Sequence, residues 1–76
     1  EGNMLFMKNK DVPGVIGRVG TILGEAGVNI GEYLLSRTSQ NETAYAVVKL
    51  DSALDKHILE SLNKLDEIID IHQLQL

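Results

Sequence analysis

The chain has 76 residues, with seven lysines and arginines against eleven aspartates and glutamates, no cysteine and one proline. A chain this short holds one small domain and leaves no room for an enzyme with its own substrate cleft. The net charge of −4, with scattered cations, argues against a nucleic-acid partner. The absence of cysteine, of a membrane span and of a signal segment predicts a cytoplasmic protein without a membrane partner.

The amino-terminal part of the chain predicts a strand followed by a helix. Residues 4–8 include four apolar residues, which indicates a short buried strand. Pro13 suits the first turn of a helix, and Gly27 suits the left-handed residue that follows a helix end. Between them apolar residues recur every three or four positions, so we expect a helix from about Pro13 to about Ala26.

The remaining segments predict a hairpin, a second helix and a last strand. Residues 28–38 and 43–50 are rich in strand-forming side chains, and a polar turn at residues 39–42 separates them. Ser52 and Asp55 resemble a capping box before a helix over residues 53–64. Residues 68–76 form the expected fourth strand. The order predicts an α+β, ferredoxin-like βαββαβ fold, with two helices on one face of a four-stranded antiparallel sheet.

Several functions of this fold lack the residues that they need. RNA recognition uses aromatic residues surrounded by cations, whereas this acidic chain has only Phe6, Tyr33 and Tyr45. His57 and His72 are far apart, no thiol is present, and no serine has a histidine at motif spacing. We therefore expect a binding module with no catalytic residue, no metal and no cofactor.

The first helix carries an unusual stripe of glycines, formed by Gly17, Gly20 and Gly24. Each interior glycine costs a helix about 1 kcal/mol relative to alanine. One interpretation is that a partner helix or a ligand approaches this backbone closely, which makes the stripe a dimer interface. The other is that the helix packs its small residues on its own sheet.

The loop before that helix predicts a ligand site. The first N–H groups of a helix attract a carboxylate, here near Gly14 and Val15, while Asp11 would attract an ammonium group. A free amino acid carries both groups. Asn9 and Asn29 could add further hydrogen bonds. The alternatives are a helix-capping role for Asp11 and a turn role for Asn29.

These segments resemble the ACT domain family over nearly the whole chain. The resemblance rests on the run from Asn9 to Gly20, which contains Asp11-Val12-Pro13-Gly14, and on Gly27-Val28-Asn29-Ile30. It implies an amino-acid effector bound between two copies, with Asn9, Asp11 and Asn29 at the positions of the family's serine contacts. Asn9 departs from members that place a ring-bearing residue there. The expected binding residues are Asn9, Asp11, Val12, Pro13, Gly14, Val15, Asn29 and Ile30.

The resemblance also implies a parent protein and an assembly. The Gly-rich run and Leu35-Ser36-Arg37 are similar to the carboxy-terminal serine-sensing domains of bacterial D-3-phosphoglycerate dehydrogenases, which are NAD-dependent. Residues 1–76 would then be one regulatory domain from the end of a longer enzyme, contacting its catalytic domains. The alternatives are an iron-sulfur L-serine dehydratase as parent, or a dimerisation module without a ligand. The family pairing implies a homodimer through the second strand and the first helix.

Overall fold

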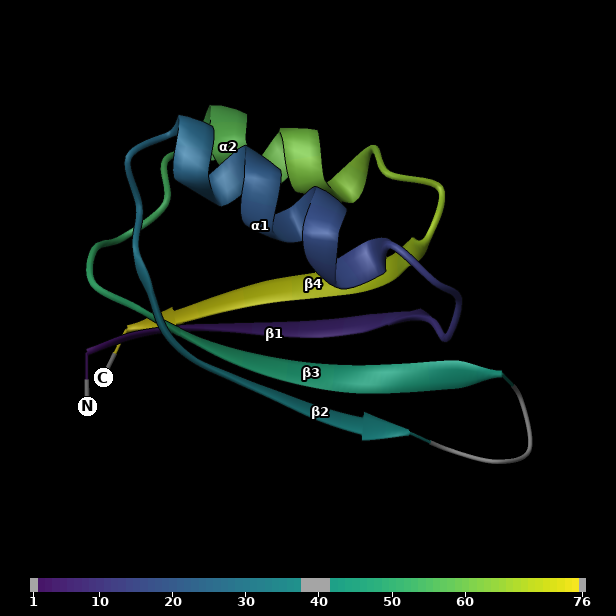
Figure 1. The fold of residues 1–76 in the computed structure, drawn as a ribbon. Helices are drawn as coiled ribbons and strands as arrows, with labels where there is room; N and C mark the ends of the chain where they lie inside the picture. Colours follow the sequence, from purple (N-terminus) through teal and green to yellow (C-terminus); the bar gives the residue numbers. More distant parts are fainter. Residues whose placement is uncertain (1, 38–41, 76) are drawn as a thin grey trace.

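The computed structural model describes residues 2–37 and 42–75. Its elements follow the predicted order, β1 (Asn3–Lys10), α1 (Val15–Glu25), β2 (Ile30–Arg37), β3 (Thr43–Leu50), α2 (Lys56–Asn63) and β4 (Ile68–Gln75). The strands form one antiparallel sheet in the order β2-β3-β1-β4, and both helices cover the same face of it (Figure 1). The predicted α+β, ferredoxin-like fold is confirmed.

Alternation along the strands builds the core between the sheet and the helices. In β3 every second residue is buried, and in β1 Leu5 and Met7 are buried while their neighbours are not. Helix α1 contributes three core residues one turn apart, Val15, Val19 and Leu23, and α2 contributes Leu62. The largest fully buried side chains are Leu5, Val19, Leu23, Val48 and Leu62.

Helix α1 ends as the sequence predicts. Gly27 has φ +78°, and its N–H donates to the carbonyl of Gly24 at 3.0 Å. The N–H of Val28 donates to the carbonyl of Leu23 at 3.0 Å, and both side chains are buried. These two bonds form a Schellman motif, which turns the chain toward β2.

The ends of several elements differ from the prediction. Strand β1 is longer, because polar residues at both of its ends continue the ladder with β3. Helix α2 begins only at Lys56, because Asp55 is itself the cap and accepts a hydrogen bond from the N–H of Ile58 at 3.0 Å. The predicted cap, Ser52, instead bonds the carboxylate of Asp51. Most of the predicted turn at residues 39–42 lies outside the described residues.

Candidate functional site

Seven of the eight residues of β2 are exposed, which is unusual for a strand rich in apolar side chains. Only Tyr33 is partly buried, while Ile30, Leu34 and Leu35 are open to solvent. Strand β2 also lies at the edge of the sheet, so its outer N–H and C=O groups face away from the domain. A long, apolar edge strand of this kind favours pairing with another strand.

The loop between β1 and α1 is held firmly by its neighbours. The N–H of Lys10 donates to the carbonyl of Glu67 at 2.8 Å, and the N–H of Asp11 donates to the carbonyl of Glu42 at 2.7 Å. Arg18, in the first turn of α1, forms an ion pair with Glu67. These contacts fix the loop against β3 and β4, so its polar groups have defined positions.

Helix α1 begins at Gly14 without a side-chain cap. Gly14 has φ +92°, a conformation that other residues adopt only with strain. An added Cβ at this position would lie 3.4 Å from the guanidinium of Arg18. Asp11 does not cap the helix, so that alternative for its role is wrong. The first N–H groups of α1 therefore keep the positive end of the helix dipole available.

Asp11 is paired with a residue that the sequence did not single out as part of the site. Nε of Arg37, the last residue of β2, lies 3.2 Å from Oδ1 of Asp11. The Arg37 side chain is 70% exposed and the Asp11 side chain 27%. An ion pair this exposed contributes at most about 1 kcal/mol to stability. Each of the two side chains can therefore leave the other and contact a different charged group at little cost.

Asn9, two residues before Asp11 in the chain, is almost completely buried, with 3% exposure. Its amide donates to the carbonyl of Lys10 at 2.8 Å. Its Oδ1 is buried and has no hydrogen-bond partner within residues 2–37 and 42–75. A buried acceptor without a partner carries an energetic penalty, which a hydrogen-bond donor at this point would remove.

Asn29 lies at the other end of the sheet from Asp11. Ile30 pairs with Leu50, which in turn pairs with Asn3 at the start of β1, whereas Asp11 follows the end of β1. Eight strand residues separate these ends by about 25 Å. The structure thus brings the predicted residues 9–15 together, but it does not bring Asn29 and Ile30 to them within one chain.

Asn29 is anchored by the loop after β3. Its backbone N–H donates to Oδ1 of Asp51 at 3.0 Å, and its side-chain amide donates to Oδ2 at 3.2 Å. The backbone hydrogen bond is the main reason why the pKa of Asp51 lies below its ordinary value of 3.8. Asn29 is thus more than a turn residue, and among residues 2–37 and 42–75 no hydrogen bond reaches its side-chain oxygen, which can accept one.

The glycine stripe of α1 faces open space. A Cβ added to Gly17, Gly20 or Gly24 would meet nothing within 4 Å. A hollow of about 440 Å³ borders the helix at Gly14 and Gly17. The interpretation that these glycines pack on the chain's own sheet is therefore wrong, whereas a close approach by a partner helix remains a prediction.

The structure also bears on metal binding and on membrane insertion. Within the described part of the chain, no group of three or more histidine, cysteine, aspartate or glutamate residues could hold a metal ion. Among the same residues, no helix is long and apolar enough to cross a membrane.

Comparisons with known proteins identify relatives of this arrangement. The family model described as "ACT domain" matches residues 3–67. The chain is 29% identical over 75 residues to D-3-phosphoglycerate dehydrogenase of Bacillus subtilis, covering 99% of this chain and 14% of that protein. It is 33% identical over 78 residues to D-3-phosphoglycerate dehydrogenase of Archaeoglobus fulgidus, covering 100% of this chain and 15% of that protein.

Two further matches bear on the parent protein and the fold. The probable L-serine dehydratase beta chain of Bacillus subtilis is 28% identical over 67 residues, covering 88% of this chain and 30% of that protein. The ACT domain from GTP pyrophosphokinase of Chlorobium tepidum has a TM-score of 0.67 at 12% identity and covers 95% of each chain. The second match supports the fold alone. The chain spans about a seventh of the two dehydrogenases described above.

Proposed function

The chain belongs to the ACT domain family, and from this membership we propose that it binds L-serine and regulates a D-3-phosphoglycerate dehydrogenase. A domain of this family is a regulatory module, so it has no active site of its own. The dehydrogenase activity and its NAD cofactor would belong to the rest of a longer protein, of which residues 1–76 would be the carboxy-terminal domain.

The junction of β1 and α1 carries the proposal, because its charges complement a zwitterion. Asp11 offers a carboxylate to the ligand's ammonium group, and the uncapped start of α1 offers N–H groups to its carboxylate. The unpartnered Oδ1 of Asn9 accepts a bond from the ammonium or the serine hydroxyl. Residues 12–15 contribute their backbone, and the exposed side chains of Val12 and Pro13 border the site.

The ion pair between Asp11 and Arg37 can be replaced by contacts from each of the two side chains to a zwitterionic ligand. A zwitterion that enters the pair gives its ammonium to Asp11 and its carboxylate to the guanidinium of Arg37. One exposed ion pair is replaced by two charge-assisted contacts, so the exchange favours binding. Arg37 is thus proposed as an additional contact for the carboxylate.

Two copies are needed to complete this site. If the β2 edges of two copies pair antiparallel, the start of one β2 lies beside the end of the other. Asn29 of the partner subunit then lies near Arg37 and Asp11, and Ile30 follows it. The same two-fold axis places the two α1 helices side by side, where Gly17, Gly20 and Gly24 permit close approach.

Regulation would follow from the position of the ligand between copies. Serine that contacts both subunits stabilises one relative arrangement of the pair over others. Catalytic domains attached to the two copies would respond to that arrangement, so serine binding and catalytic activity become coupled. The L-serine dehydratase match supports a second parent with the same effector, and the coding sequence next to this domain distinguishes the two.

Calorimetric titration with L-serine, glycine, L-alanine and L-threonine tests the proposal. We expect serine to bind more tightly than alanine, because the hydroxyl adds one hydrogen bond, worth about 0.5–1.5 kcal/mol. That difference corresponds to roughly two- to twelvefold in the dissociation constant. If none of the four ligands releases or absorbs heat at millimolar concentration, the domain is an assembly module without an amino-acid effector.

A further inference from the structure

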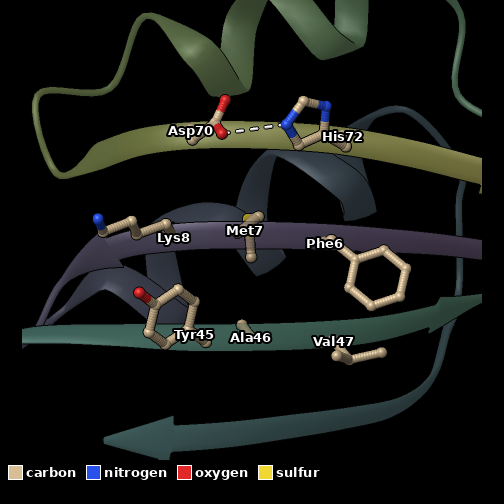
Figure 2. Close-up of a pocket in the computed structure, with 8 residues that line it drawn as sticks. All are labelled: Phe6, Met7, Lys8, Tyr45, Ala46, Val47, Asp70 and His72. Atoms are coloured by element: carbon tan, nitrogen blue, oxygen red, sulfur yellow. Dashed lines mark hydrogen bonds and ion pairs between the residues drawn. The ribbon is translucent and has the colours of Figure 1, made fainter. Parts of the chain in front are cut away.

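The sheet has one face that points away from both helices, which we call the open face (Figure 1). Two aromatic side chains lie on it, Phe6 of β1 and Tyr45 of β3, together with Val47 (Figure 2). Tyr45 is 49% exposed, while Phe6 and Val47 are partly buried. A hollow of about 200 Å³ lies among these side chains, so the open face has an apolar recess that solvent can reach.

The register of β1 and β3 leaves room for one planar group between the two rings. Phe6 is paired directly with Val47, two residues beyond Tyr45, so Phe6 and Tyr45 are diagonal neighbours on adjacent strands. Diagonal neighbours lie about 7–8 Å apart, and apolar atoms in contact lie about 3.5–4 Å apart. In Figure 2 the space between the rings is bordered by Met7 and Ala46, whose side chains are buried. A flat ring placed in this space therefore contacts both aromatic side chains.

Positive charge borders one end of this hollow. Nζ of Lys8 lies 5.9 Å from the centre of the Tyr45 ring. Lys10 is two residues further along β1, so its side chain lies on the same face. Among residues 2–37 and 42–75, neither lysine forms an ion pair with an acidic side chain. Both ammonium groups are therefore available to an anion that enters the hollow.

The anions of the open face, in contrast, already have partners. Glu32 forms an ion pair of 3.3 Å with Lys49. Oδ2 of Asp70 lies 3.0 Å from Nε2 of His72 (Figure 2). Three lysines against two carboxylates give the described part of the face a formal charge of +1, although the whole chain carries −4. The hollow thus combines apolar walls with the positive charge that attracts an anion.

We propose that the hollow between Phe6 and Tyr45 binds a small planar aromatic carboxylate. Its ring lies between the two aromatic side chains, where stacking and the burial of apolar surface stabilise it. Its carboxylate contacts the ammonium group of Lys8, and Lys10 adds to the attraction.

The size of the hollow limits the ligand to a small molecule. Pockets for drug-sized ligands measure about 300–1,000 Å³, whereas this hollow measures about 200 Å³. A molecule of one or two rings therefore suits it. A single-stranded nucleic acid needs several stacking residues along a basic groove, and this hollow has room for one ring only.

The hollow is separate from the proposed serine site. Arg37 is paired with Ala44, whose side chain is buried on the helix side of the sheet. Tyr45 is the next residue of β3, so it points to the opposite face. Binding on the open face can therefore be measured independently of serine binding, and failure of one proposal leaves the other standing.

A chemical-shift titration of the isotope-labelled chain with phenylacetate tests the proposal. We expect saturable shifts at the amides of Phe6, Lys8 and Tyr45, with a dissociation constant of about 1–10 mM for a ligand of this size. Phenylacetamide, which has the same shape and no charge, should bind about fivefold more weakly, because it lacks the ion pair. Cyclohexylacetate keeps the charge but has a thicker, puckered ring, so it should give no saturable shift.

Four single variants assign the contacts. Tyr45→Leu keeps an apolar side chain but removes the ring, and it should abolish the shifts, whereas Tyr45→Phe should retain them. Lys8→Gln should weaken phenylacetate binding about fivefold and leave phenylacetamide binding unchanged. Lys64→Gln removes the same charge from an exposed position at the end of α2 and should change neither affinity. Circular dichroism verifies that all four variants are folded.

Three results would overturn the proposal. The first is the absence of saturable shifts up to about 50 mM phenylacetate, well above the expected constant. The second is equal affinity for phenylacetate and phenylacetamide, which would mean that the lysines do not recognise the ligand. The third is a set of shifts confined to residues 9–15, which would place the ligand in the loop before α1 instead.

Discussion

Replacing Leu62 by alanine should lower the free energy of unfolding by about 3–5 kcal/mol, the range for fully buried leucines that leave a cavity. Leu62 is 0% exposed and is the one residue of α2 that is buried. A 76-residue domain has a total stability of about 4–11 kcal/mol. The variant should therefore lose much or most of its stability, as measured by urea denaturation followed by circular dichroism.

Leu74→Ala is the matched control for this measurement. It removes the same atoms from a side chain that is 45% exposed in β4, and a change of at most about 1 kcal/mol is expected, because little buried surface is lost. Equal effects for Leu62 and Leu74 would show that α2 does not pack on the sheet as described.

Replacing Asp11 by alanine should weaken L-serine binding by roughly ten- to a hundredfold. The proposed contact between its carboxylate and the ligand's ammonium is charge-assisted, and loss of such a bond costs about 1.5–3 kcal/mol. The domain should stay folded, because the Arg37 pair is exposed and contributes little. Calorimetric titration gives the affinity, and circular dichroism verifies the fold.

Glu60→Ala removes the same charge from the exposed side of α2 and controls for the change in net charge. It should leave the affinity for serine unchanged. Equal weakening by both variants would mean that overall charge determines binding, and unchanged binding in Asp11→Ala would remove Asp11 from the site.

Local patterns predicted the fold because they depend on neighbours in sequence. The alternation in β3 and the three- to four-residue spacing in α1 follow directly from strand and helix geometry. Element ends were less predictable. The start of α2 depends on which polar residue caps it, and Asp55 satisfies the N–H of Ile58 where Ser52 was expected to act.

The candidate site was only partly predictable, because some of its residues are close in sequence and others are positioned by the folded sheet. Asn9, Asp11 and Gly14 are close in sequence, so the loop that holds them could be recognised from its motif. The pairing of Asp11 with Arg37 depends on where β2 ends in the folded sheet, which no local pattern specifies. The distance between Asn29 and Asp11 likewise follows from strand order, which places them at opposite ends of the sheet within one chain.

The central claim is that serine binds between two copies, with Asp11 from one and Asn29 from the other. Its most direct test is a calorimetric titration of Asp11→Ala and Asn29→Ala, each alone and then refolded together in equal amounts. In a two-fold dimer, random mixing makes half of the dimers mixed, and each mixed dimer has one intact site and one doubly altered site. The account predicts that wild-type affinity returns in about a quarter of the sites. A mixture that binds serine no better than the two variants alone would contradict the shared site.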